Sequence, residues 1–361
     1  MNLLLILNYL QFFFSLCFCS IEWDFSGVNL PNDVPIWRFA FWRNRVFLAL
    51  PRWKKRQINW PTLLEAPWHN DAEIINLKYP VKYFENYNQN INENSINCNN
   101  LMSITGLDVD LRGRLWILDA PRFTFCPAKI LIYDLQKNKE ISRSCLSQVP
   151  TSGLKTLVVD QVTSASGYRA FIGDPGDDSI IIYSLGFSGR NKWWKLKLRH
   201  DKKIPRVYTT DMAISKKLSK IYLTGSASNG IFSIPLESAR HNEPNSRFIQ
   251  YVNVTYHGSK IGTSSGLCCD VNGGLHYFLV SQHASVRWDM KTTLKAEGHS
   301  VVLQNEQVPI IIDYKMDNQK NILGLINYRH PFINKSIYDI DYEWIPKTRI
   351  IKVWKHKRSL P

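Results

Sequence analysis

The fold is decided by residues 106–119, which read Gly-Leu-Asp-Val-Asp-Leu-Arg-Gly-Arg-Leu-Trp-Ile-Leu-Asp. The stretch begins with a short apolar strand that closes on a carboxylate. It then passes through a glycine-containing turn and ends in a second apolar strand. Short runs of apolar and β-branched residues that are separated by turn residues are typical of paired β-strands. The sequence therefore predicts a strand–turn–strand unit here.

Similar units precede and follow this one along the chain. Their second strands begin at Arg45, Arg114, Arg169, Lys220, Gly274 and Asn321, so the repeat is roughly 50 residues long. Several copies add a third apolar strand, and one less regular strand would complete a four-stranded unit. Six units of this length are typical of a β-propeller. We therefore predict an all-β chain in which residues 20–361 form a single six-bladed β-propeller domain with a basic C-terminal tail.

The first nineteen residues contain no Asp, Glu, Lys or Arg and form one apolar run. This pattern predicts a signal peptide over residues 1–19, with Cys17 and Cys19 before the cleavage site and Ser20 at the start of the mature chain. A membrane anchor is the alternative, but a spanning helix needs about 20 apolar residues and usually a basic flank. We expect a secreted, extracellular protein without a membrane span after cleavage. Two glycosylation acceptors fit this interpretation: Asn253-Val254-Thr255 and Asn334-Lys335-Ser336.

The chain is basic, with a formal net charge of +15. Its cations gather in residues 52–56, 192–206 and 347–358. The Lys-Trp-Trp-Lys run at 192–195 interleaves aromatic rings and cations, as nucleic-acid grooves do. Because a secreted protein rarely meets nucleic acid, we expect no nucleic-acid partner. Two interpretations remain: solvated strand edges that block edge pairing, and attraction to an acidic extracellular matrix or another polyanion.

Five cysteines remain after cleavage of the leader. An odd number in an oxidising compartment leaves at most two disulfides and one free thiol. Cys98 and Cys126 flank a predicted strand pair, which favours a bridge between them. Adjacent Cys268 and Cys269 point to opposite faces if their segment is a strand, and we expect one of them to pack as a small hydrophobe.

Motifs for hydrolytic nucleophiles, zinc proteases, dinucleotides and nucleoside phosphates do not occur in the sequence. We therefore predict neither a cofactor nor a metal. Four carboxylates recur at predicted strand ends: Asp110, Asp160, Asp270 and Asp313. Such a ring could hold a divalent cation, but a bond from each Asp to its own turn is the simpler interpretation. The same two interpretations, in the same order, apply to the acidic turn at residues 174–178.

The histidines offer few candidates for acid–base chemistry. His276 lies within a predicted strand, so a packed structural role is favoured. His257, His283 and His299 fall in loop-like stretches and are the better acid–base candidates. No residue is assigned a catalytic role from the sequence.

Several motifs resemble those of the insect yellow and major royal jelly protein family. Residues 45–53, Arg-Val-Phe-Leu-Ala-Leu-Pro-Arg-Trp, resemble a conserved strand of that family, and residues 114–119 resemble its Arg-Leu-Trp-Val-Leu-Asp motif. Cys126-Pro127 with residues 130–135 resembles a third motif, and the resemblance runs from about Trp37 to Lys352. It implies a six-bladed propeller and an extracellular insect protein. Members are associated with cuticle pigmentation, dopachrome conversion, amine binding in saliva or royal jelly storage.

The sequence also departs from the family pattern at three places. Arg287 replaces a usual cysteine, which implies that one family disulfide is missing. Residues 304–309 replace an acidic segment that usually precedes the last blade, and Tyr328 replaces an asparagine. These segments can help to line the channel, so the family's amine-binding pattern is not carried over unchanged.

The leading hypothesis is a secreted propeller that binds a small aromatic ligand, a catechol or a biogenic amine, in cuticle pigmentation or melanin biology. One alternative is an isomerase-type enzyme that converts dopachrome, and another is a matrix or storage protein without a small ligand. If a ligand pocket exists, we expect these residues to form it: Trp116, Asp119, Asp174, Trp288, Asn327, Tyr328 and Arg329.

Overall fold

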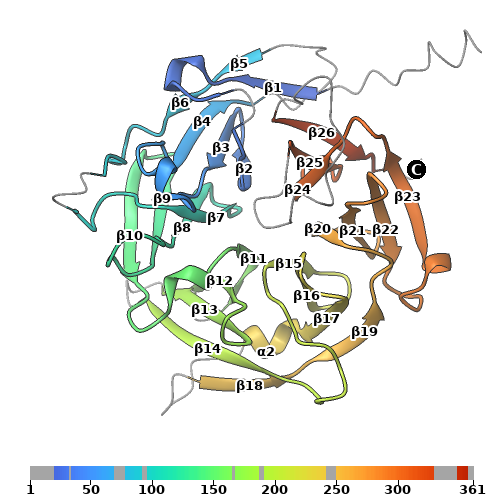
Figure 1. Ribbon diagram of the computed structural model, residues 1–361. Coiled ribbons are helices and arrows are strands. Elements are labelled where there is room, and N and C mark those ends of the chain that lie inside the picture. The colour runs from blue at the N-terminus through green and yellow to red at the C-terminus, as the bar shows by residue number, and fades with distance from the viewer. Residues whose placement is uncertain are drawn as a thin grey trace, which may run out of the picture.

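The strands form six sheets around a central axis, as Figure 1 shows. The computed structural model describes residues 20–31, 34–68, 78–91, 96–164, 167–186, 191–240, 249–328 and 348–356. Within these residues each sheet has four or five strands, and its strands follow one another outward from the axis. The predicted all-β, six-bladed propeller is therefore confirmed.

The first three blades are built from residues 38–199, with one strand added from later in the chain. Blade 1 comprises β2 (Arg38–Trp42), β3 (Arg45–Ala49), β4 (Leu63–Pro67) and β6 (Lys82–Tyr83). Blade 2 comprises β7 (Ile104–Val109), β8 (Arg114–Asp119), β9 (Lys129–Asp134) and β10 (Lys139–Cys145). Blade 3 comprises β11 (Leu157–Ser164), β12 (Gly167–Asp174), β13 (Ser179–Leu185), β14 (Lys192–Arg199) and the later strand β18 (Ile249–Asn253).

The other three blades complete the circle. Blade 4 comprises β15 (Asp211–Ser215), β16 (Lys220–Thr224), β17 (Gly230–Pro235) and β19 (Thr255–Ser259), with the short helix α2 (Leu236–Arg240) after β17. Blade 5 comprises β20 (Ser264–Cys269), β21 (Gly274–Leu279), β22 (Ala284–Asp289) and β23 (His299–Gln304). Blade 6 comprises β24 (Ile310–Met316), β25 (Ile322–Asn327), β26 (Arg349–Trp354), β1 (Ser20–Asp24) and β5 (Lys78–Pro80). Single 3-10 turns lie at Ser26–Val28, Lys55–Gln57, Thr151–Gly153 and Ala296–Gly298.

Burial along each strand follows its position within a blade. Every residue of β8, β12 and β13 is buried, because a middle strand is covered on both faces by neighbouring blades. The outer strand β14 instead alternates between exposed or half-buried and buried residues, because one of its faces meets solvent. The apolar core therefore lies between the blades, and the inner strands are left to line the axis.

The inner strands β2, β7, β11, β15, β20 and β24 form a closed ring, since each contacts the next and β24 contacts β2. The propeller is closed in blade 6, where the N-terminal strand β1 pairs antiparallel with the C-terminal strand β26. Ser20 lies opposite Ile351 in this register, and Glu22 lies opposite Arg349. The repeat pattern did not predict this pairing, because it joins segments from the two ends of the chain.

Two of the four recurring carboxylates do not lie at strand ends, so this part of the prediction is wrong. β11 continues past Asp160 to Ser164, and β24 continues past Asp313 to Met316. The register of β24 shifts between Ile311 and Asp313, and the strand then keeps pairing with β25. Asp317 rather than Asp313 begins the turn that follows β24.

A disulfide joins Cys98 to Cys126, as the sequence predicted. Cys145, Cys268 and Cys269 are free thiols, so the described chain has one bridge and more free thiols than the single one expected. Cys269 packs in the core between blades 4 and 5, whereas Cys268 contacts the core between blades 5 and 6. The two neighbours therefore point to opposite faces of β20, as predicted.

The predicted signal peptide, residues 1–19, lies outside the described residues. Among the residues that the structure describes, no helix has the length and apolar character needed to cross a membrane.

Candidate functional site

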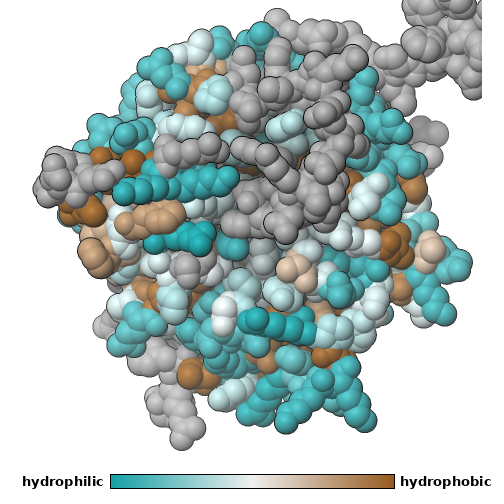
Figure 2. Space-filling model, viewed as in Figure 1, coloured by the Kyte–Doolittle hydropathy of each residue, from teal (hydrophilic) through white to brown (hydrophobic). Residues whose placement is uncertain are grey.

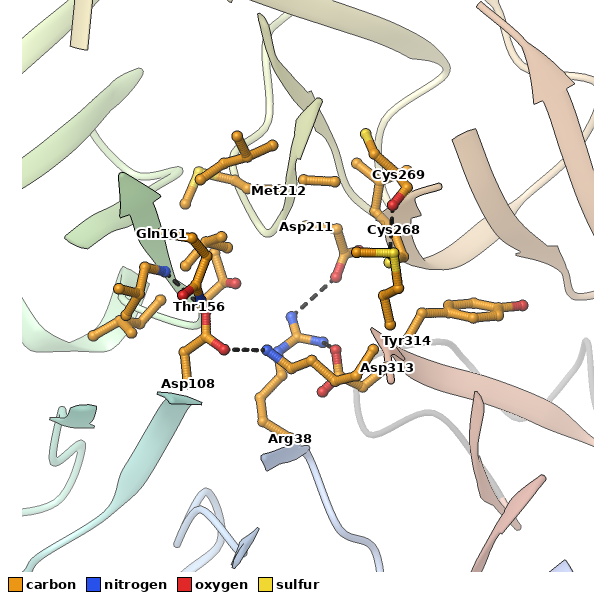
Figure 3. Close-up of a pocket in the computed structure, with 18 of the residues that line it drawn as sticks. Arg38, Asp108, Thr156, Gln161, Asp211, Met212, Cys268, Cys269, Asp313 and Tyr314 are labelled. Carbon is orange, nitrogen blue, oxygen red and sulfur yellow. Dashed lines mark hydrogen bonds and ion pairs between the residues drawn. The ribbon is translucent and has the colours of Figure 1, made fainter. Parts of the chain in front are cut away.

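A cavity of about 200 Å³ lies in the central channel, and all six inner strands contribute side chains to it. Figure 3 shows how these side chains converge from different blades. One charged lining residue, Lys216, follows the end of β15, and the charged residues on the inner strands are Arg38, Asp108, Asp211, Asp313 and Lys315. Because each comes from an inner strand, closure of the propeller is what brings them together.

Arg38 links three blades across this cavity. Its Nη2 lies 2.9 Å from Oδ1 of Asp211 on β15, and its Nη1 lies 3.6 Å from Oδ1 of Asp313 on β24. The same guanidinium donates to the carbonyl oxygens of Thr210 at 3.0 Å and Ile312 at 3.1 Å. Arg38 is buried. A guanidinium that is held by several acceptors keeps a fixed orientation, so Asp211 and Asp313 are held in place with it.

The two carboxylates around Arg38 differ in their surroundings. Asp313 Oδ2 also accepts a hydrogen bond from the backbone N–H of Phe39 at 3.2 Å. Burial raises the pKa of Asp313, although Arg38 and Lys315 act in the opposite direction. For Asp211, the hydrogen bonds found among the described residues use only Oδ1. Its second oxygen is therefore available to a donor in the cavity.

A second ion pair joins β24 to β7. Lys315 Nζ lies 3.2 Å from Oδ1 of Asp108 and 3.4 Å from the carbonyl oxygen of Leu107. Asp108 Oδ2 accepts from the backbone N–H of Val159 at 2.8 Å. Burial disfavours the charged form of Lys315, but Asp108 and Asp313 outweigh it and raise the pKa of the ammonium. The Lys315–Asp108 pair therefore links blade 6 to blade 2 at the channel.

The remaining wall of the cavity is apolar. It includes Val158, Met212, Ile214, Leu267 and Met316. Cys268 also lines it, and burial raises the pKa of this thiol to about 12, so it is not a thiolate nucleophile at neutral pH. A few fixed polar groups within an apolar wall are typical of small-molecule sites.

A wider cavity of about 370 Å³ adjoins the first. The two share Asp108, Gln161, Lys216, Lys315 and Met316. The Lys315–Asp108 pair is therefore common to both. The channel thus has two compartments, with the Arg38 cluster in the smaller one.

On the face that Figure 2 shows, the described hydrophobic residues are scattered among hydrophilic ones. Exposed large hydrophobic residues such as Leu111, Phe125 and Val301 belong to different loops and strands. Scattered residues of this kind are normal on soluble proteins. The channel is therefore the better candidate site.

Of the residues singled out from the sequence, Trp116 and Asp119 lie in blade 2. Trp116 is fully buried, and its Nε1 donates to Oδ2 of Asp110 at 2.9 Å. Asp119 is also fully buried and accepts from the backbone N–H groups of Met102 at 2.9 Å and Ser103 at 2.7 Å. Lys129 Nζ lies 3.1 Å from the same carboxylate. These contacts anchor the segment that leads into β7.

Asp174 belongs to an acidic turn that pairs with the basic strand β14. Lys195 Nζ lies 3.4 Å from Asp174 Oδ2 and 2.5 Å from Asp177 Oδ2, and Lys197 also contacts Asp177. Arg206 lies 3.0 Å from Asp178. The acidic turn and part of the basic segment predicted at 192–206 therefore neutralise each other, which supports the turn interpretation over a cation loop.

Trp288 and Asn327 are buried in blades 5 and 6. Trp288 Nε1 donates to the carbonyl oxygen of Thr293 at 3.3 Å. Asn327 Nδ2 donates to the carbonyl oxygen of Ile36 at 2.6 Å and so ties the end of β25 to the entry of blade 1. Tyr328 follows Asn327 and is partly buried, whereas Arg329 lies outside the described residues.

The structure thus places Asn327 and Tyr328 together at the end of β25 and Trp116 and Asp119 together on β8, whereas Asp174 lies in blade 3 and Trp288 in blade 5. None of these described candidates is among the residues that line the channel cavity. Their role in ligand binding stays a prediction.

The sequence reasoning did not single out Arg38, Asp108, Asp211 or Lys315. The sequence did contain an indication of their role, because each is a charged residue inside or beside the first apolar strand of a repeat. In a propeller this strand lines the channel, so a charge within it has to face the axis or be paired between blades.

The turn role of the recurring carboxylates is confirmed for Asp110 and Asp270. Oδ1 of Asp110 accepts from the N–H of Arg112 at 2.9 Å, and Oδ1 of Asp270 accepts from the N–H of Asn272 at 2.7 Å. Asp160 lies within β11, where its Oδ1 accepts from the N–H of Val162 at 3.1 Å and its Oδ2 pairs with Arg240 at 2.7 Å. In the described part of the chain, no group of three or more His, Cys, Asp or Glu residues is placed to hold a metal ion.

His276 is fully buried, and its Nε2 lies 3.0 Å from Oδ2 of Asp270, so the predicted structural role is confirmed. Arg287 Nε lies 2.6 Å from the same carboxylate oxygen. Of the acid–base candidates, His283 lies in a turn, whereas His257 lies in β19 and His299 begins β23. None of these histidines lines the channel cavity.

Comparison with known proteins identifies a family that matches most of the chain. A family model described as major royal jelly protein matches residues 102–352. The chain is similar to a dopaminechrome tautomerase from Drosophila melanogaster, with 28% identity over 200 residues that cover 52% of this chain and 41% of that protein. It is also similar to major royal jelly protein 6 from Apis mellifera, with 23% identity over 335 residues that cover 86% of this chain and 72% of that protein. Among solved structures, a gluconolactonase from Xanthomonas campestris has a TM-score of 0.49 and 11% identity, over 92% of this chain and 97% of that one.

Proposed function

Because the chain belongs to the major royal jelly protein family, we propose that its propeller binds a small aromatic ligand, a catechol or a biogenic amine, in the channel cavity. The observation that carries the proposal is the buried cluster of Asp211 and Asp313 around Arg38. A ligand ammonium would donate to the second oxygen of Asp211. The aromatic ring would then lie against the apolar wall that Met212, Ile214 and Leu267 provide.

Charge and size both support this choice of ligand. The cavity as a whole is lined by three cations, Arg38, Lys216 and Lys315, and by three carboxylates, Asp108, Asp211 and Asp313. The Arg38 cluster itself has one cation between two carboxylates, so its immediate surroundings favour a cationic group over an anionic one. The cavity volume of about 200 Å³ suits a single substituted ring rather than a larger molecule.

The residues predicted from the sequence give an alternative location for the same activity. Tyr328 follows the buried Asn327 at the end of β25, and Arg329 comes next in the sequence. In this alternative the Arg329 guanidinium would donate to a ring hydroxyl oxygen of the ligand, or to a carboxylate where the ligand carries one. Substitutions at the two locations distinguish them, because Arg329→Ala leaves the Arg38 cluster intact.

A second candidate function is conversion of dopachrome or a related aminochrome by an isomerase-type reaction. The similarity to a protein named dopaminechrome tautomerase favours it. Such a reaction moves a proton, and a positioned base assists proton transfer. Asp313 is the candidate base, because burial raises the pKa of its carboxyl.

We propose that the protein acts outside the cell, in cuticle pigmentation or melanin biology. The apolar pattern of residues 1–19 supports secretion. Asn253 is exposed at the end of β18, where a glycan would extend into solvent. The second predicted acceptor, Asn334, lies outside the described residues.

The experiment is a calorimetric titration of the secreted protein with dopamine, serotonin and octopamine, beside an absorbance assay of dopaminechrome decay. Micromolar binding without faster decay supports the binding protein. Decay faster than the buffer blank supports the isomerase. If neither occurs, the small-ligand proposal is wrong, and a matrix or storage role that uses the basic surface takes its place.

A further inference from the structure

The wider compartment of the channel has a different chemical character from the Arg38 cluster. Four cations line it: Arg43, Lys216, Lys315 and Lys320. Lys315 is paired with Asp108, and Asp110 is paired with Arg114 at 2.6 Å. Among the described residues, Arg43, Lys216 and Lys320 have no carboxylate within ion-pair distance, and the only carboxylate that lines this compartment without a cation is Asp317. This compartment therefore carries an excess of positive charge.

These cations come from three hairpins that the propeller brings to one mouth of the channel. Arg43 lies between β2 and β3, Lys216 between β15 and β16, and Lys320 between β24 and β25. The inner strands of these hairpins surround the axis in Figure 1. Partial burial lowers the pKa of Lys216, and repulsion from Lys320 lowers it further. Like charges that are held together in this way are stabilised when an anion binds between them.

Lys320 also occupies a backbone position that equivalent turns give to glycine. The turns that begin at Asp110 and Asp270 reach Gly113 and Gly273 three residues later, with φ values of 73° and 89°. The turn that begins at Asp317 has the same construction, but its fourth residue is Lys320 with φ of 68°. The first residue of all three turns donates its N–H to the carbonyl oxygen four residues later. A left-handed φ is unfavourable for a residue that has a side chain. Glycine would therefore suit this position of the turn better than Lys320 does, and the turn itself does not require the lysine.

From this convergence we propose a second binding site, in which Arg43, Lys216 and Lys320 bind a small organic anion through its carboxylate or phosphate group. Guanidinium and ammonium groups donate charge-assisted hydrogen bonds to both kinds of anion. Trp42 lines the same compartment, and the Arg43 guanidinium lies 4.5 Å from the centre of its ring. An aromatic face beside the cations admits a ring attached to the anionic group. This site goes beyond the proposed amine site, because the residues that carry it do not belong to the Arg38 cluster.

The test is a calorimetric titration of the secreted protein with benzoate and with inorganic phosphate, at constant ionic strength in chloride. We expect one of these probes to bind, and the stronger one identifies the preferred group. In Lys216→Gln/Lys320→Gln the affinity should fall by at least about tenfold, because two charge-assisted contacts are lost. The matched control is Lys137→Gln, which removes an exposed lysine from the turn between β9 and β10 and should leave the affinity unchanged.

Lys320→Gly separates binding from folding. The substitution places glycine where the equivalent turns have Gly113 and Gly273. The thermal midpoint should therefore stay the same or rise, while the affinity for the anion falls. The proposal is overturned if neither probe binds more tightly than chloride. It is also overturned if the double variant binds as the wild type does, or if Lys320→Gly lowers the midpoint and leaves binding unchanged.

Discussion

At the scale of single residues, Arg52 explains why the Pro-Arg-Trp motif matters. The Arg52 side chain is buried and donates to four carbonyl oxygens, those of Trp60, Gln89, Leu101 and Met102, at distances between 2.5 and 3.2 Å. It therefore ties the segment before β7 to blade 1. The motif was recognised from the sequence, but its structural role was not, because the acceptors are backbone groups from distant segments.

Arg52→Lys should lower the free energy of unfolding by about 3 kcal/mol, because an ammonium cannot reach all four buried acceptors. The exposed residue Arg122 gives a matched control, and Arg122→Lys should change the stability by less than about 0.5 kcal/mol. Urea unfolding followed by tryptophan fluorescence measures both values. Equal stability of the two variants would contradict this role for Arg52.

His257 should make stability depend on pH. Burial, with a smaller effect from Lys220, lowers its pKa from 6.5 to about 4, and Nε2 lies 2.8 Å from Ser233 Oγ. Between pH 6.5 and 4 the unfolded chain binds a proton at His257 that the folded chain does not bind. The contribution of the neutral His257 to the free energy of unfolding should therefore be fully present above pH 6.5 and should decrease as the pH falls towards 4.

The measurement for His257 is the thermal midpoint of wild type and His257→Gln across this pH range. The thermal midpoint of His257→Gln should decrease less than that of wild type as the pH falls from 6.5 to 4. The half-buried residue His200 gives the control, since His200→Gln should keep the wild-type slope. Parallel curves for wild type and His257→Gln would contradict the prediction.

At the scale of the elements, the repeat pattern predicted the strands that are continuous and apolar. β8 and β16 begin at Arg114 and Lys220, where the sequence placed them. The short or polar outer strands were harder to predict. β5 pairs with β1 and β18 pairs with β14, both remote in sequence, and β18 leaves its own repeat to join blade 3. Such pairing depends on tertiary packing rather than on local periodicity.

The closure of blade 6 by β1 leads to a prediction at this scale. Trp23 is buried in the core that joins β1 to blades 1 and 6. Trp23→Ala should cost about 3–5 kcal/mol, because it leaves a large cavity at the closure. Hydrogen exchange should show that β1 and β26 lose protection together, since they pair with each other.

Tyr251→Ala is the control for the closure, because Tyr251 is 58% exposed on β18. It should change stability by less than about 0.5 kcal/mol and leave β26 protected. If Trp23→Ala left the protection of β26 at its wild-type level, β1 would not close the ring.

At the scale of the whole molecule, the architecture and the Cys98–Cys126 bridge could be predicted, whereas the candidate site could not. A six-fold repeat is a local property of the sequence. The cavity instead depends on which inner-strand residues face each other across the axis. Arg38 and Asp211 are far apart in the chain, and only closure of the ring places them 2.9 Å apart.

The turns illustrate the same difference. Asp110 and Asp270 bond their own turns, as local chemistry predicted. Asp313 has the same residue type and a similar preceding strand, but the register shift in β24 places it beside Arg38 in the channel. Its role could therefore be assigned only from the three-dimensional arrangement.

The measurement that tests the central claim most directly is the affinity for dopamine of Asp211→Asn, determined by calorimetry beside Asp178→Asn and Arg329→Ala. Asn keeps the shape of the Asp211 side chain and an acceptor for Arg38 but removes the negative charge. The channel site predicts at least about tenfold weaker binding in Asp211→Asn, and wild-type affinity in Asp178→Asn, whose carboxylate pairs with Arg206 outside the channel. Wild-type affinity in Asp211→Asn together with weaker binding in Arg329→Ala would contradict the channel site and place the ligand at the end of β25.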